Sequence, residues 1–334
     1  MERFGIHRSL EPPRVLPQMA RALDTQSPLT AEEFAVDVDY LNIDSASYRQ
    51  LRDASGGSVE SMSRDILGIV AAKGKMQNPV TGSGGMLVGT VAELGSSRTE
   101  PEVGTRVASL VSLALTPLVL DEITHLDPSS EKVKVKGRAI LFGSSSYATV
   151  PPDLGDEIAL AVLDVAGAPA WAAGLVRSAM KVVVIGAGGK SGMLVCARAA
   201  RAVGRAGRVL GLCWPEDTVG AAKDAGAEAR AVDCTDALSV FEAVKEALGG
   251  ELADVVFVCS NVAGCEGGAL LACDDGGEIV FFSMATSFTS AALTAEGLGK
   301  TCRMTIGNGY VPGHAELALD LVRGEPRLLD RLRQ

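Results

Sequence analysis

The sequence predicts an α/β protein in which a compact β-rich domain precedes a doubly wound parallel sheet of the Rossmann type. Before about residue 150, short runs such as EFAVDVDYLNI, MLVGTVAELG and YATVP are broken by Gly, Pro and Ser, which is typical of a compact β domain. From about Asp156 strands and helices alternate, and the strands are continuous apolar runs such as KVVVIGA and ADVVFVCS. Such strands are buried on both faces, which indicates a parallel sheet between helices.

Each domain can be divided into elements from its periodicity. In the first, strands are expected within residues 33–43, 86–95, 104–113, 137–143 and 147–151, with a helical insert at 58–73. In the second, strands are expected within 181–187, 207–214, 228–233, 253–260, 276–284 and 300–309. Helices are expected within 156–176, 190–204, 218–227, 237–248, before Leu271 and at 314–324.

Composition and charge limit the partners and the compartment. A chain of 334 residues is long enough for two buried cores, and a net charge of −10 without a basic run argues against nucleic acid and anionic membranes. Seven cysteines occur singly, without C-x-x-C spacing, which favours reduced thiols. The N-terminus lacks an apolar signal core, and no uncharged apolar run reaches ~18 residues. We therefore expect a cytoplasmic protein.

The stretch VVVIGAGGKSG, residues 182–192, has features of two phosphate-binding loops. A P-loop, G-x-x-x-x-G-K-S/T, requires a glycine at position 184, which is Val184 within the expected strand. A dinucleotide turn fits better, since Gly186 allows the tight turn, Gly188 allows a close approach to a pyrophosphate, and a helix follows. The third glycine of that motif falls on Ser191. The expected loop residues are Gly186, Gly188, Gly189, Lys190, Ser191 and Gly192.

Other coenzyme contacts are expected at the carboxyl ends of the following strands. The strand at 207–214 ends in Trp214, with Glu216 and Asp217 just beyond, and positions 209–222 contain no Arg or Lys to pair with a 2′-phosphate. This favours NAD, with NADP left possible. Further contacts are expected at Ser260, Ser283, Met284 and Asn308.

The order of the domains resembles the medium-chain dehydrogenase/reductase superfamily. MLVGTVAELG is similar to its G-x-V-x-x-V-G stretch, and KTCRMTIGNG is similar to its last Rossmann strand, which in many members lines a dimer interface. The resemblance implies a GroES-like catalytic domain over residues 1–155, a Rossmann domain over 156–309 and a return segment, 310–334, that belongs to the first domain. It also implies a homodimer or tetramer.

Longer blocks resemble one family within that superfamily, the L-erythro-3,5-diaminohexanoate dehydrogenases of lysine fermentation. The blocks are LNIDSAS, NPVTGSGGMLVGTV, VASLVSLALTPL, LDVAGAPA, VIGAGGKSGML, FFSMATSFTSAAL and IGNGYVPGHAE. The resemblance implies NAD-dependent oxidative deamination of a small diamino acid, with release of ammonia.

A catalytic zinc is not expected. Zinc-dependent members of the superfamily need Cys and His ligands, but Gly85 and Met86 stand where their His and Glu would align. The first domain contains no cysteine, and His7, His125 and His314 lie outside the aligned motifs.

Two carboxylates are candidates for holding the amine and acting as the base, because amine oxidation needs a neutral amine and then an activated water. Asp44 ends an expected strand in the region that supplies a zinc ligand in metal-dependent relatives, and Asp164 lies in an apolar segment where burial would raise its pKa. The alternative for Asp44 is a helix N-cap, and for Asp164 a structural acceptor. Ser45 and Ser83 are candidates for polar contacts with the substrate, and Lys73 and Lys75 for its carboxylate or for plain solvation.

Two other functions remain open from the residues. One is a zinc-free NAD(P)H quinone or enone reductase of the same superfamily, which would not need two acids. The other is a catalytically silent dinucleotide-binding protein.

Overall fold

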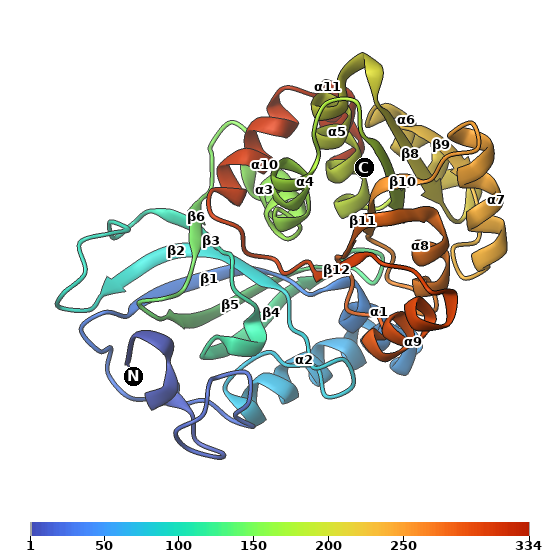
Figure 1. Cartoon of the computed structure of the whole chain (residues 1–334). Helices are drawn as coiled ribbons and strands as arrows, with labels where there is room; N and C mark the ends of the chain where they lie inside the picture. Colours follow the sequence, from blue (N-terminus) through green and yellow to red (C-terminus); the bar gives the residue numbers. More distant parts are fainter. Residues whose placement is uncertain (1, 334) are drawn as a thin grey trace. The chain divides into compact units, whose positions relative to one another are not determined.

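The computed structural model describes residues 2–333, and the chain forms two compact units, Met1–Leu160 and Ala161–Gln334. Figure 1 shows an antiparallel sheet in the first unit and a parallel sheet flanked by helices in the second. The division falls five residues beyond the expected one, within helix α3 (Gly155–Leu163). It also assigns residues 310–334 to the second unit, which differs from the expected return to the first.

Unit 1 is built on a six-stranded antiparallel sheet with the order β4-β5-β1-β2-β3-β6. Each of the five expected runs contains a strand, but β4 was not expected, because its acids and His give it no apolar alternation and most of it is not buried. The strands are β1 (Phe34–Asn42), β2 (Met86–Leu94), β3 (Arg106–Ser109), β4 (Leu118–Leu126), β5 (Lys132–Leu141) and β6 (Tyr147–Thr149).

Two helices cover the core of unit 1. Helix α1 (Ser45–Ala54) follows β1 directly, and α2 (Val59–Lys73) matches the expected insert, with Ser58 capping its start. Gly74 ends α2 at a φ of 62°, a left-handed conformation that glycine adopts at little cost. The helices bury Tyr48 and Ile66 in the cluster that Leu41 of β1 and Ile43, the residue after β1, enter. This packing fixes the end of β1, which carries the candidate carboxylate.

Unit 2 is built on a six-stranded parallel sheet with the order β12-β11-β10-β7-β8-β9. This is the Rossmann strand order, with the reversal between β7 and β10. The strands are β7 (Lys181–Ile185), β8 (Arg208–Cys213), β9 (Glu228–Ala231), β10 (Ala253–Val258), β11 (Cys273–Phe281) and β12 (Arg303–Ile306). The helices are α4 (Gly167–Leu175), α5 (Lys190–Val203), α6 (Val219–Asp224), α7 (Ala237–Ala247), α8 (Glu266–Ala272), α9 (Phe288–Leu298), α10 (His314–Arg323) and α11 (Pro326–Leu332).

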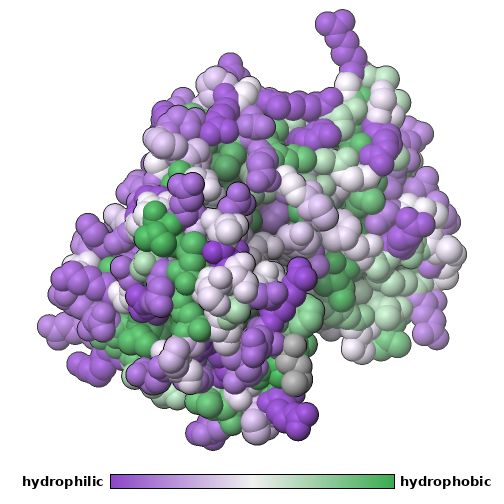
Figure 2. All heavy atoms as spheres, turned by 90° about the vertical axis from the view of Figure 1, so that its left-hand side faces the viewer, coloured by the Kyte–Doolittle hydropathy of each residue, from purple (hydrophilic) through white to green (hydrophobic). Residues whose placement is uncertain are grey.

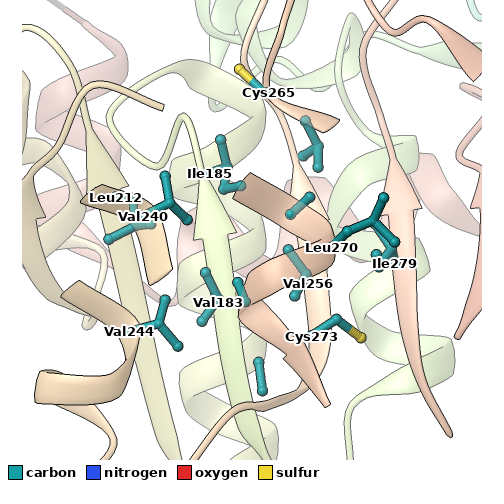
Figure 3. Close-up of a cluster of buried hydrophobic side chains, with 14 of the residues drawn as sticks. Val183, Ile185, Leu212, Val240, Val244, Val256, Cys265, Leu270, Cys273 and Ile279 are labelled. Atoms are coloured by element: carbon teal, nitrogen blue, oxygen red, sulfur yellow. The ribbon is translucent and has the colours of Figure 1, made fainter. Parts of the chain in front are cut away.

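One face of the parallel sheet buries a continuous apolar cluster. Val183 and Ile185 of β7 lie opposite Val240 and Val244 of α7 and Leu270 of α8 (Figure 3). The continuous valine runs therefore have the physical origin that the sequence indicated, since these strands meet helices rather than water.

The C-terminal helices were only partly expected. Helix α10 coincides with the expected helix at 314–324, whereas α9 and α11 were not assigned from the sequence. Helix α10 packs against α4 and α5, and α11 against α5 and α6. Helices α10 and α11 thus pack with their apolar faces on the helices of unit 2.

Within residues 2–333, no single helix has the length and hydropathy needed to cross a membrane; α3 and α4 together meet those criteria, but they are bent by 51° at the break between them.

Candidate active site

The glycine loop of unit 2 lies at the carboxyl end of β7, where the Rossmann strand order reverses. Gly186 has a φ of 78°, and a Cβ there would lie 2.7 Å from the backbone nitrogen of Ser260. A side chain at position 186 would therefore be strained and would collide with the end of β10. The turn thus requires glycine and places Ser260 beside the loop.

Gly188 and Gly192 are closely packed against other parts of the protein, whereas Gly189 is not. A Cβ on Gly188 would lie 2.5 Å from the Cβ of Thr218, and one on Gly192 would lie 2.7 Å from the Cα of Ala187. Both glycines are therefore needed by packing within the protein, and Gly192 provides the close helix–strand contact that the motif usually assigns to its third glycine. By contrast, Gly189 is exposed, and the nearest atom to its missing Cβ is the Gly186 carbonyl oxygen at 3.7 Å.

Helix α5 begins at this loop with Gly189 as its N-cap residue and no side-chain cap. The first amides of an α-helix have no partner within the helix, and the helix dipole favours an anion beside them. In a 14-residue helix this arrangement fits the pyrophosphate of a dinucleotide. The geometry of Gly186, Gly189 and α5 therefore fits the expected coenzyme.

Three buried thiols surround the loop. The Gly188 amide, the Gly186 amide and the Ser191 side chain act to lower the pKa of Cys213, Cys234 and Cys259, respectively. Burial raises the pKa of all three thiols, to about 12 for Cys234 and Cys259. They remain protonated at neutral pH and are not nucleophiles.

The remaining coenzyme candidates of unit 2 follow the carboxyl ends of the strands. The end of β8 leads to Trp214, whose side chain is 63% exposed, and the segment after β11 contains Ser283, whose hydroxyl accepts a hydrogen bond from the Ala285 amide at 3.1 Å. Met284 is exposed. Asn308 follows β12 and is exposed, and its carbonyl accepts a hydrogen bond from Trp171 Nε1 at 3.0 Å. Since all strands run parallel, these residues lie at the same end of the sheet, beyond the carboxyl ends of its strands.

In unit 1, Asp44 is the N-cap of α1, which is the structural alternative that the sequence left open. Only one of its two carboxylate oxygens takes part in the cap. Its Oδ1 caps α1 by accepting a hydrogen bond from the Ser47 amide at 3.0 Å. Its Oδ2 is buried and has no hydrogen-bond partner among the described residues. A carboxylate oxygen in that situation is available to a cationic ligand or to a water molecule.

Asn42, two residues earlier, was not singled out from the sequence. Its side chain is 0% exposed, and neither Oδ1 nor Nδ2 has a hydrogen-bond partner within residues 2–333. Leaving a buried polar group unpaired costs about 1–3 kcal/mol. No feature of the sequence signals this, because an Asn at the end of a strand is ordinary unless its burial is known.

Ser45 is hydrogen-bonded to a second carboxylate, that of Glu131, which nothing in the sequence had indicated. The hydroxyl of Ser45 donates to Glu131 Oε1, and the Ile43 amide donates to the Glu131 carbonyl at 3.0 Å. Burial, together with the charges of Asp127 and Glu131, raises the pKa of Tyr48 to about 12. The end of β1 therefore has two carboxylates near Tyr48, those of Asp127 and Glu131, together with the cations Arg52 and Lys132.

The loop at 78–85 is fastened to α1. Asn78 is fully buried, and its amide donates to Gln50 Oε1 at 2.8 Å while its Oδ1 accepts from the Val80 and Thr81 amides. The hydroxyls of Thr81 and Ser47 are hydrogen-bonded at 2.5 Å. Ser83 is half-buried in this loop, and its carbonyl accepts from the Asn78 amide at 2.8 Å. These hydrogen bonds hold the loop against the N-terminal part of α1.

Asp164 lies in the short break between α3 and α4, within unit 2. It is half-buried rather than enclosed, although its neighbours Leu163 and Ala166 are buried. The apolar residues Leu163 and Ala166 are therefore in the core, while Asp164 lies in the turn between the two helices.

Lys75 is buried, contrary to the expectation that it is either solvated or close to a substrate carboxylate. Its Nζ donates to the Pro17 carbonyl at 2.8 Å, and Lys73 Nζ donates to the Gln77 carbonyl at 2.9 Å. Burial, and secondarily the charge of Lys73, lowers the pKa of Lys75 to about 8. Both lysines therefore hold the backbone of unit 1.

We expect the Lys75→Met variant to gain less stability than the wild type when the pH is raised. The pKa of Lys75 is lower in the folded chain than in the unfolded chain, so between about pH 8 and 10 the unfolded state binds more protons and wild-type stability increases with pH. Urea unfolding at pH 7 and pH 9.5 should show the wild type gaining about 1 kcal/mol or more relative to Lys75→Met. An equal pH response of the two proteins would contradict the assignment, and exposed Lys136→Met serves as the control.

Within residues 2–333, no group of three or more His, Cys, Asp and Glu side chains is arranged to hold a metal ion. A shallow, mainly apolar pocket in unit 1 is lined by nine residues, none of them a candidate site residue: Phe4, Leu16, Pro17, Gln18, Val111, Leu115, Phe142, Ser144 and Ser145. The face of the molecule in Figure 2 carries hydrophilic and hydrophobic side chains, and the hydrophobic ones lie in separate groups rather than in one continuous patch.

Comparison with solved structures shows the fold. A mycobacterial protein complexed with NADPH matches with a TM-score of 0.62 and 17% identity, covering 95% of this chain and 91% of that chain. Escherichia coli quinone oxidoreductase complexed with NADPH matches with a TM-score of 0.58 and 16% identity at the same coverage. The fold is that of the medium-chain dehydrogenases/reductases, a GroES-like unit with a Rossmann unit, as expected from the sequence.

Comparison of sequences identifies the family. Residues 7–151 match the model of the L-erythro-3,5-diaminohexanoate dehydrogenase N-terminal domain. Proteins named L-erythro-3,5-diaminohexanoate dehydrogenase from Acetoanaerobium sticklandii and Fusobacterium nucleatum are each 44% identical over 326 residues, which cover 96% of this chain and 95% and 94% of theirs. The chain belongs to the L-erythro-3,5-diaminohexanoate dehydrogenase family and is an oxidoreductase of the dehydrogenase class.

Proposed function

We propose that this protein catalyses the NAD-dependent oxidative deamination of L-erythro-3,5-diaminohexanoate to 5-amino-3-oxohexanoate and ammonia, as a cytoplasmic step of lysine degradation. The observation that carries this proposal is the 44% identity over 96% of the chain to two enzymes of that name. The loop at Gly186 and the uncapped start of α5 support it, since they fit a dinucleotide.

The coenzyme would be held by unit 2. When bound, NAD accepts a hydride from the carbon that carries the amine. The amides at the start of α5 would bind the pyrophosphate, Trp214 would cover the adenosine, and Ser260, Ser283, Met284 and Asn308 would line the nicotinamide side. Glu216 and Asp217, in a turn without a nearby Arg or Lys between 209 and 222, would favour the ribose of NAD over the 2′-phosphate of NADP.

The amine chemistry would rest on carboxylates. Asp44 would hold the reacting ammonium through Oδ2, take its proton and later activate water, while Asp164 would hold the second ammonium. Ser45 and Ser83 would add polar contacts. A carboxylate suits these steps because it stabilises both the ammonium and the iminium that replaces it.

One assay separates this function from its alternatives. Initial rates of NADH formation from the diamino acid with NAD or NADP should show turnover, with NAD preferred. Loss of NAD(P)H with quinones and no reaction with the amine would support a quinone reductase. Binding of NADH without turnover of either substrate would support a silent dinucleotide-binding protein.

We also propose that the protein forms a homodimer through β12. This strand ends the parallel sheet of unit 2 and exposes Met304 and Ile306, the latter by 63%. An edge strand with unpaired backbone groups and apolar side chains is suited to pair with the same strand of a second copy.

Ile306→Lys should therefore shift the protein toward the monomer, because two added charges would be buried at a symmetric contact. Light scattering coupled to size-exclusion chromatography would measure the mass. Leu238→Lys, at an exposed position of α7, is the control and should leave the mass unchanged. A wild-type monomer, or an unaltered dimer in Ile306→Lys, would exclude this edge.

A further inference from the structure

The side chains of Asn42 and Asp44 place three unpaired polar atoms at the end of β1. Both amide atoms of Asn42 and Oδ2 of Asp44 are buried without a hydrogen-bond partner within residues 2–333. Buried polar groups are normally paired, and those that are not usually bind water or a ligand. Asn78 shows the ordinary case in the same unit, since it is equally buried and its amide is bonded to Gln50, Ser47, Val80 and Thr81.

Asn42 and Asp44 are two residues apart where β1 ends and α1 begins. Residues two apart on an extended segment point the same way, and Ile43, between Asn42 and Asp44, enters the apolar core of unit 1. Gly85 lies directly against this segment, and a Cβ there would lie 2.9 Å from the Asp44 amide nitrogen. Backbone therefore packs against this segment on one side, and the alternation along the chain puts the side chains of Asn42 and Asp44 on the side opposite Ile43.

We propose that Asn42 is a positioning residue that, with Asp44, holds the water molecule that hydrolyses the iminium. This inference rests on the proposed function. The Asn42 amide would donate to the water oxygen, and the water would donate one proton to Asp44 Oδ2. One lone pair of the water would then remain to attack carbon. An amide and a carboxylate two residues apart on one side of the chain are suited to orient water in this way, because they supply both a donor and an acceptor.

The step balances without another reactant once Asp44 has released to solvent the proton that it took from the ammonium. Hydride transfer to NAD leaves the iminium at C3. The water oxygen forms a bond to C3, and Asp44 takes the proton that the water loses. The carbinolamine nitrogen then receives this proton, the C–N bond breaks as the C–O double bond forms, and the hydroxyl proton leaves with the ammonia as ammonium.

The test compares Asn42→Leu with Asn78→Leu. Asn42→Leu removes two unpaired polar atoms at nearly constant volume, so its Tm should equal or exceed that of the wild type, whereas Asn78→Leu breaks a satisfied network and should lower Tm. On rapid mixing with NAD and the diamino acid, Asn42→Leu should form about one equivalent of NADH per site at the wild-type rate. Its steady-state rate should then fall about tenfold or more, because hydrolysis has become slow.

Each other result overturns the inference. Equal losses in the burst and the steady state would place Asn42 in hydride transfer or substrate binding, and weaker NADH binding would place it at the coenzyme. Unchanged kinetics, or a fall of Tm like that of Asn78→Leu, would leave the amide without this role. A wild type that forms no NADH from the diamino acid would refute the proposed function itself, whereas Tm and NADH affinity would still show whether the Asn42 amide is structural or binds coenzyme.

Discussion

Asp44→Asn is expected to lower kcat by about 10²–10⁴-fold, the usual contribution of a positioned acid or base, while NADH binding stays intact. Asparagine removes the charge and the basicity of Oδ2, so it can neither take the ammonium proton nor activate water. It keeps the capping oxygen, because Asn and Asp are equally good N-caps and the Ser47 amide can still donate to it. Steady-state NADH formation and NADH titration by fluorescence measure the two effects separately.

The capping role of Asp44 calls for a matched control. Asp236 caps α7 in the same way, by accepting hydrogen bonds from the Leu238 and Ser239 amides. Asp236→Asn makes the same chemical change at a cap, so any loss that comes only from a weakened cap should appear in both variants. Wild-type turnover in Asp44→Asn would remove Asp44 from the mechanism, and an equal loss in Asp236→Asn would reduce its role to structure.

The sequence predicted well what depends on local pattern. Continuous valine runs such as β7 identified the parallel strands, because burial on both faces removes every polar side chain. The loop after β7 was located for a similar reason, since a tight turn between a strand and a helix needs glycine at Gly186 whatever the rest of the chain does. By contrast, β4 was missed because an exposed edge strand has no apolar face to signal it.

The sequence could not predict what depends on pairing across the fold. Glu131 reaches Ser45 only because β1 and β5 are antiparallel in a register that places Asn42 opposite Lys132. Asn42 and Asn78 are both buried asparagines, yet among the described residues only the side chain of Asn78 has hydrogen-bond partners, and nothing in the local sequence separates them. The roles of the glycines also depend on distant atoms, since the space beside Gly188 is filled by Thr218.

Gly189→Val tests the coenzyme site with the least change to the protein. Gly189 has φ and ψ of −81° and 168°, an extended conformation that valine adopts readily, and its surroundings are open. The folded protein should therefore tolerate the side chain, with Tm lowered by only a few degrees. A pyrophosphate held by the first amides of α5 would meet the added methyl groups and lose charge-assisted hydrogen bonds of about 1.5–3 kcal/mol, which is about 10- to 100-fold in the Kd for NADH.

The control is Gly297→Val, since Gly297 also has open surroundings but lies within α9. It should leave the Kd for NADH unchanged. Because Gly186, Gly188 and Gly192 are each required by contacts inside the protein, replacing them would confuse folding with binding. A Gly189→Val protein that binds NADH as tightly as the wild type would show that the pyrophosphate does not lie against the start of α5. The dinucleotide assignment of this loop would then fail even though its shape is intact.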